Sequence, residues 1–135
     1  MSKEAQAQKD FSIVIVDDSD FTRKHICAFL SKMSFEKVRD FSNAKDALDY
    51  IALKKVDVAI IDVVMPEISG IDLTKKISEK FPNTKVVMMS SLGQERVVME
   101  SISAGAVDFL QKPLNEELLM DALLRLWEMK NKGNN

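Results

Sequence analysis

The sequence predicts an open α/β sheet of five parallel strands covered by helices on both faces. Its apolar pattern alternates between short continuous runs, typical of buried strands, and stripes with a period near 3.6, typical of amphipathic helices. At 135 residues, with 46% hydrophobic and 30% charged composition, the chain suits one globular domain with a real core. We expect this domain to span 11–130, with a flexible N-terminal segment over 1–10 and a flexible tail over 131–135.

Five strand candidates are recognised from their apolar residues. Four are continuous runs that read as buried strands: "IVIV" at 13–16, "VDVAII" at 56–61, "KVVMM" at 85–89 and "VDFL" at 107–110. The fifth, "EKVRDF" at 36–41, is more polar, with Val38 and Phe41 as its apolar members, which is typical of an edge strand. Met88 and Met89 lie inside one run and are interpreted as core-filling side chains.

Helices are predicted after each strand. Segments with helical apolar spacing cover 19–33, 44–51, 71–81, 94–103 and 115–130. Ser42 or Asn43 is a suitable N-cap for the second helix, and Pro82 closes the third. Gly105 follows the fourth helix, where glycine suits a left-handed C-cap. The elements therefore alternate as (βα)5, which implies right-handed crossovers.

Charge and hydropathy exclude several classes of protein. The 19 basic residues are scattered among 21 acidic ones, for a net charge of -2, which gives no footprint for nucleic acid. The N-terminus lacks the apolar region of a signal peptide, and no apolar stretch approaches the roughly 18–20 residues needed to span a bilayer. We expect a cytoplasmic protein without membrane insertion. The single cysteine, Cys27, is interpreted as structural. The only histidine, His25, is interpreted as a surface or partner-contact residue and not as a phosphorelay histidine.

Chemically active side chains stand where the predicted strands end. Ligand sites of open parallel sheets lie beyond the carboxyl ends of the strands. The residues at these ends are Asp17 and Asp18 after the first strand, Asp62 after the third, Ser90 after the fourth and Lys112 after the fifth. Clustered carboxylates suit Mg²⁺, and a lysine and a hydroxyl complement phosphoryl oxygens. This set predicts Mg²⁺-dependent phosphoryl transfer, with Mn²⁺ able to substitute.

Four motifs carry a resemblance to a known family: "VDD" at 16–18, "IIDVVMPEISG" at 60–70, "MSS" at 89–91 and "QKP" at 111–113. With them, residues 11–130 resemble the receiver domain of two-component response regulators. The resemblance implies a doubly wound, flavodoxin-like fold with strand order 2-1-3-4-5. The stretch "SSLGQE" at 90–95 is similar to the CheY-type chemotaxis subgroup. No output domain accompanies these motifs, so we expect a stand-alone receiver.

The resemblance also implies roles for the acidic residues. It makes Asp62 the nucleophile that accepts a phosphoryl group from a phosphohistidine. Asp18 and Asp62 would be direct Mg²⁺ ligands, Asp17 would act largely through water, and the carbonyl of Val64 would supply another oxygen. Val64 and Leu92 are apolar where polar side chains influence attack by water in related receivers, which leaves the rate of dephosphorylation open.

Further residues take their roles from the same resemblance. Ser90 would bond a phosphoryl oxygen after transfer, and Lys112 would form an ion pair with the phosphoryl group. Ser90 and Phe109 would be the switch residues, with Phe109 in the position of the switch aromatic. The peptide bond between Lys112 and Pro113 is expected to be cis, a geometry essentially confined to proline.

Partners follow from the subgroup and from the last predicted helix. The implied partners are a CheA-like histidine kinase, a downstream target such as a flagellar motor switch protein, and a phosphatase. Beside the core stripe of 116–130, Met120, Leu124 and Trp127 form a second apolar stripe. With Phe109 and the fourth helix, this stripe is predicted to form a partner or dimer face; the alternative is a deeply set helix.

Two other functions stay open at this point. A phosphorelay intermediate would keep the fold and pass its phosphoryl group to a histidine phosphotransfer protein. An Mg²⁺-dependent phosphatase of the haloacid dehalogenase type would need a general acid two residues after the nucleophile, where Val64 stands. The leading hypothesis is a signalling phosphoacceptor that catalyses only its own phosphotransfer and dephosphorylation.

Overall fold

A computed structural model describes residues 2–133 and contains one parallel sheet of five strands in the order β2-β1-β3-β4-β5. The strands are β1 (Ser12–Val16), β2 (Lys37–Phe41), β3 (Val58–Asp62), β4 (Lys85–Ser90) and β5 (Asp108–Gln111). The helices are α1 (Lys3–Asp10), α2 (Asp20–Lys32), α3 (Ala44–Leu53), α4 (Gly70–Lys80), α5 (Glu95–Ser103) and α6 (Glu116–Gly133). Strand order and pairing confirm the predicted flavodoxin-like architecture.

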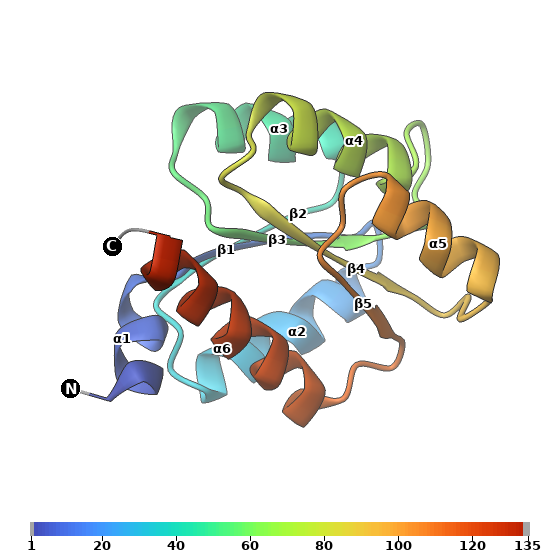
Figure 1. Cartoon of the computed structure of the whole chain (residues 1–135). Coiled ribbons are helices and arrows are strands. Elements are labelled where there is room, and N and C mark those ends of the chain that lie inside the picture. Colours follow the sequence, from blue (N-terminus) through green and yellow to red (C-terminus); the bar gives the residue numbers. More distant parts are fainter. Residues whose placement is uncertain (1, 134–135) are drawn as a thin grey trace.

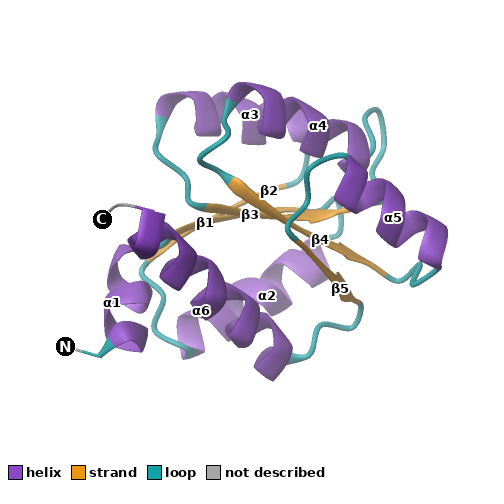
Figure 2. Ribbon diagram, viewed as in Figure 1, coloured by secondary structure: helices purple, strands orange, loops and turns teal. Residues whose placement is uncertain are grey.

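The helices form two layers that sandwich the sheet. Helices α1, α2 and α6 lie on one face, and α3, α4 and α5 lie on the other (Figures 1 and 2). Successive residues of a strand point to opposite faces, so each strand contributes to two cores. In β1, Ile13 and Ile15 pack on the α1, α2 and α6 side, whereas Val14 and Val16 pack on the other side. This two-sided burial explains why the central strands are continuous apolar runs.

Local signals place the helix ends close to the predicted positions. Of the two N-cap candidates for α3, Asn43 is the cap, because its side chain accepts the N–H of Asp46 at 2.9 Å. Gly105 follows α5 with φ of 115°, and a Cβ there would meet Ser78 Oγ at 2.0 Å. The predicted glycine at this turn is therefore required by backbone conformation and by space.

The N-terminal segment differs from the prediction of a flexible 1–10. Helix α1 occupies Lys3–Asp10, with Ser2 as an N-cap that accepts the N–H of Ala5 at 3.1 Å. Ala7 is fully buried, and α1 contacts α6. The side chain of Gln8 donates to the carbonyl of Met33 at 2.6 Å, which ties α1 to the end of α2. Tertiary contacts of this kind order a segment that has almost no apolar stripe of its own.

The same helix changes the environment of the second stripe on α6. Met120 and Trp127, predicted to lie on an exposed partner face, are 8% and 5% exposed and belong to the core. Phe11, at the end of α1, packs edge-on against Trp127 with ring centroids 5.5 Å apart. The partner-face prediction is wrong for these two residues and the alternative, a deeply set helix, holds for them; Trp127 is covered by Phe11 at the end of the N-terminal segment. Leu124 is partly buried.

Helix α6 is the longest helix in the described part of the chain. It continues to Gly133, so positions 131–133 of the predicted flexible tail are helical, while 134–135 lie outside the described residues. Within residues 2–133, no helix combines the length and the apolar character that crossing a membrane would require.

Candidate functional site

Three carboxylates meet at the carboxyl end of the sheet. Asp17 and Asp18 follow β1, and Asp62 is the last residue of β3. Each offers one oxygen, and the three oxygens lie within 4.8 Å of one another. Pairing of Val16 with Ile61 between the two strands brings their ends level. Asp17 and Asp62 are buried, and Asp18 is exposed, so the cluster opens to solvent on one side.

Lys112 supplies the positive charge beside these carboxylates. Its Nζ lies 2.8 Å from Asp17 Oδ2 and 3.1 Å from Asp62 Oδ1, so one ammonium bridges the two buried acids. Its backbone N–H donates to the carbonyl of Ser90 at 2.8 Å, just beyond β5. The bond to Pro113 is cis, as the resemblance implied.

Ser90 ends β4 on the neighbouring side of Asp62. It follows Met89, which pairs with Asp62, and its side chain is buried. Its Oγ accepts the N–H of Leu92 at 2.9 Å, which leaves the hydroxyl proton available to donate. Val64 and Leu92 are 57% and 43% exposed, so they give this end of the sheet an apolar rim.

The ionised form of Asp62 is disfavoured in this environment. Burial, and then repulsion from Asp17, raise the pKa of the Asp62 carboxyl above its ordinary value, and the contacts with Lys112 only partly oppose them. Burial alone would lower the pKa of Lys112, but hydrogen bonds to both carboxylates outweigh it and the net pKa is raised. One lysine therefore stays charged without fully compensating the acids.

The donor set fits a hard divalent cation. Three carboxylate oxygens converge on one place, and Mg²⁺ prefers oxygen ligands while keeping several waters. Asp18 is open to solvent, as a ligand beside bound waters needs to be. The excess of negative charge over the single ammonium of Lys112 is a second reason to expect a cation.

Glycine at position 70 fixes the backbone behind Asp62. A Cβ on Gly70 would lie 1.9 Å from the carbonyl oxygen of Asp62, a distance that no side chain tolerates. The N–H of Gly70 donates to the carbonyl of Val63 at 2.8 Å. Close packing of the start of α4 against the end of β3 therefore sets the position of the Asp62 backbone.

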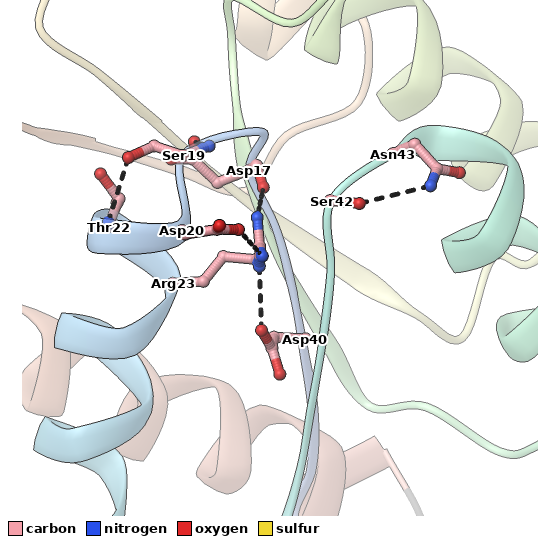
Figure 3. Close-up of polar contacts among 8 residues, drawn as sticks. All are labelled: Asp17, Ser19, Asp20, Thr22, Arg23, Asp40, Ser42 and Asn43. Carbon is pink, nitrogen blue, oxygen red and sulfur yellow. Dashed lines mark hydrogen bonds and ion pairs between the residues drawn. The ribbon is translucent and has the colours of Figure 1, made fainter.

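An arginine that the sequence reasoning passed over holds the loop that carries two of the acids. Arg23, in the first turns of α2, donates from Nη1 to the carbonyl of Asp17 at 2.7 Å and from Nε to Asp40 Oδ2 at 2.9 Å (Figure 3). It also contacts the carboxylate of Asp20. An arginine one turn after an acidic pair was the available signal, but its partner Asp40 comes from a different strand.

Two residues singled out by type lie away from the acids. His25 is exposed on α2 and stacks with Phe21 at a centroid distance of 6.4 Å. Cys27 is partly buried against the core, and burial raises the pKa of its thiol, which makes it less reactive. Neither residue is among the carboxylates and their lysine.

The fold and the acidic cluster together define a class of signalling domain, which comparison with known proteins identifies. The family model for the response regulator receiver domain matches residues 13–124. The chain is 35% identical over 111 residues to the chemotaxis protein CheY of Thermotoga maritima, which covers 82% of this chain and 92% of that protein. CheY of Bacillus subtilis is 34% identical over 111 residues, with the same coverage.

A solved structure adds a three-dimensional likeness. The CheX-CheY-BeF3-Mg²⁺ complex from Borrelia burgdorferi matches with a TM-score of 0.79 and 28% identity, covering 87% of this chain and 89% of that one. The chain therefore belongs to the response regulator receiver family. Within that family it is a receiver domain of CheY type.

Proposed function

We propose that this receiver accepts a phosphoryl group on Asp62 from the phosphohistidine of a histidine kinase. The observation that supports this most is the convergence of Asp17, Asp18 and Asp62 with Lys112 at one end of the sheet. In the step, an Asp62 oxygen forms a bond to phosphorus while the phosphorus–nitrogen bond breaks. The electron pair of that bond goes to the imidazole nitrogen.

The residues around Asp62 divide the remaining work. Asp18, Asp62 and the carbonyl of Val64 would hold Mg²⁺ or Mn²⁺ directly, and Asp17 would act through water. A cation held there would offset negative charge on the transferring group. Lys112, which now bridges Asp17 and Asp62, would turn one of its donors to a phosphoryl oxygen.

The switch would begin at the hydroxyl of Ser90. Its Oγ now accepts the N–H of Leu92, and its proton would be donated to a phosphoryl oxygen after transfer. Phe109, partly buried in the β5 strand, would then change its packing as the second switch residue. Ser90 and Phe109 belong to the adjacent strands β4 and β5, in which Ser90 pairs with Gln111 and Met88 with Phe109.

We place the partner face on the exposed side of β5 and α6. Phe109 and Leu124 keep part of their surface in solvent and line one groove with Leu118 and Asp121. Buried Met120 and Trp127 are excluded from this face. The proposal retains the groove because it adjoins the switch residue Phe109.

The CheY relatives favour a role in chemotaxis or motility signalling in the cytoplasm. The kinase would be CheA-like, and the target would be a flagellar motor switch protein or a protein of similar role. The Borrelia complex, in which CheY is bound to CheX, supports a separate protein partner, and we propose that this partner is a phosphatase. The protein would act as a phosphoacceptor whose only reactions are its own phosphorylation and dephosphorylation.

The test is phosphorylation with acetyl phosphate, followed by intact mass and by sensitivity of the adduct to hydroxylamine. The wild type should gain one phosphoryl group with Mg²⁺ and none with EDTA. Asp62→Asn should gain none, because an amide is a far poorer nucleophile than a carboxylate. Undiminished labelling of Asp62→Asn would contradict the assignment, and steady turnover of many phosphate esters would favour the phosphatase instead.

A further inference from the structure

Arg23 contacts three separate parts of the acidic end of the sheet. Its guanidinium donates to the backbone carbonyl of Asp17, to the carboxylate of Asp40 on β2, and to the carboxylate of Asp20 at the start of α2 (Figure 3). Its side chain is only 13% exposed. A planar guanidinium with five donors can hold three acceptors in one fixed arrangement, which an ammonium cannot do.

The carbonyl that Arg23 holds has a particular position in the chain. It belongs to the peptide that joins Asp17 to Asp18, so fixing it restricts how these two residues turn relative to each other. The side chain of Asp17 is held from the other direction, since Oδ1 accepts the N–H of Ser19 at 2.8 Å. The N–H of Asp17 also donates to the carbonyl of Phe41 at 3.1 Å, so β2 supports the same residue.

The positive charge of Arg23 is balanced by its own neighbours, so this residue can hold the loop without reducing the negative charge of the metal-binding carboxylates. One guanidinium faces the carboxylates of Asp20 and Asp40. Burial lowers the pKa of Arg23, but these hydrogen bonds outweigh it, so the group stays cationic. Because two carboxylates offset one cation, the guanidinium adds no net positive charge beside the metal ligands.

We infer that Arg23 is a positioning residue for the metal site: it holds the Asp17–Asp18 peptide in the orientation in which both carboxylates serve one Mg²⁺. The inference rests on the proposed function only for the identity of the cation. On this account the loop between β1 and α2 is held by Arg23 and its partner Asp40 on β2, and not by Asp17 and Asp18 themselves.

A positioning role and a purely electrostatic role of Arg23 predict different Mg²⁺ affinities for two variants. If Arg23 acted only through its charge, Arg23→Gln would tighten Mg²⁺ binding and Arg23→Lys would leave it unchanged. If it positions the loop, both variants bind Mg²⁺ more weakly, by roughly tenfold, as is usual when a group that orients a metal ligand is removed. Arg125→Gln, which removes a guanidinium paired with Asp108 on the α6 side, is the matched control and should bind as the wild type does.

The experiment titrates MgCl₂ into metal-free protein by calorimetry, with a thermal melt to confirm folding. Phosphorylation by acetyl phosphate is then measured against Mg²⁺ concentration, and saturating Mg²⁺ should restore most of the rate in both variants. Unchanged or tighter Mg²⁺ binding in Arg23→Lys would overturn the inference even if Arg23→Gln did not fold. Wild-type protein that binds Mg²⁺ but takes no phosphoryl group would instead contradict the proposed function and leave the positioning role measurable.

Discussion

The two ends of the sheet treat buried acids differently. At the amino end, Asp57 before β3 is compensated: its Oδ1 lies 2.9 Å from Lys130 Nζ, and its Oδ2 accepts the N–H of Ser12 at 2.9 Å. At the carboxyl end, Asp17 and Asp62 share the single ammonium of Lys112. The buried acid at the amino end therefore stabilises the fold through paired contacts, whereas the carboxyl end keeps an unbalanced negative charge.

The residues that stabilise the fold and the residues that we expect to bind the metal therefore lie at opposite ends of the sheet. Lys130 also lies over the rings of Phe11 and Trp127, at 5.9 and 5.7 Å, so the amino end joins α1, α6 and the sheet in one cluster. Changes there should alter the free energy of unfolding and leave Mg²⁺ binding intact. Changes at the carboxyl end should weaken Mg²⁺ binding and leave the free energy of unfolding nearly unchanged, or even raise it in the metal-free protein.

Trp127→Ala should produce the largest loss of stability. Removing a buried aromatic side chain typically costs about 3–5 kcal/mol of unfolding free energy. Trp127→Phe should cost far less, because the indole Nε1–H has no hydrogen-bond partner among the described residues and only ring volume is lost. Urea denaturation measures both. Wild-type stability together with weakened partner binding in Trp127→Ala would instead show that Trp127 belongs to the partner face.

Lys130→Met should have an intermediate effect. Methionine keeps the apolar stem but leaves the Asp57 carboxylate buried with only the N–H of Ser12, which costs about 1–3 kcal/mol. Lys45→Met is the matched control, since Lys45 pairs with Asp49 on the exposed surface of α3 and should show no measurable change. Equal losses in the two variants would show that the ion pair of Lys130 is not special.

Asp62→Asn should have the smallest effect, and in the opposite direction. Because burial and Asp17 raise the pKa of Asp62, its ionised form is less favourable in the folded than in the unfolded protein. The variant should therefore melt higher than the wild type at neutral pH without metal. The difference in melting temperature should shrink as the pH falls from the raised pKa of Asp62 in the folded protein to the ordinary pKa of an aspartate in the unfolded chain, because over that range folding takes up a proton on the wild-type carboxyl.

Added Mg²⁺ should reverse this order. A cation at 100 times its Kd stabilises the protein that binds it by about 2.7 kcal/mol, and Asp62→Asn lacks one ligand. Differential scanning calorimetry with EDTA and with Mg²⁺ checks both statements. A wild type that melts higher than Asp62→Asn in EDTA would mean that Lys112 fully compensates the acids.

Most of the sheet and its acid cluster follow from sequence because they depend on two strong rules. Buried parallel strands are continuous apolar runs, and parallel pairing brings their carboxyl ends together. Asp17 and Asp62 are far apart in the chain, yet they are neighbours because β1 and β3 are adjacent, and the long side chain of Lys112 reaches both from beyond β5. Even the more polar β2 was recognisable, since an edge strand needs few apolar residues.

The wrong or missed predictions have one cause: in each case tertiary contacts, and not the local sequence, determine the structure. Helix α1 has polar residues and alanines, so its order depends on Ala7 and Phe11 meeting α6. The same contact buries Trp127, and periodicity within α6 could not reveal it. Arg23 was missed for a related reason, because its partner Asp40 lies on a strand whose register no single-sequence pattern specifies.

The amino end of the sheet is also the suitable place to attach a tag or a label. Helix α1 and the last turns of α6 lie together there, and a five-residue strand spans roughly 16 Å between that end and the acids. An affinity tag, a surface linkage or a fluorescent reporter attached to α1 or to the last turn of α6 would lie on the side remote from Asp62. Immobilised protein should then exchange phosphodonors and Mg²⁺ as freely as protein in solution.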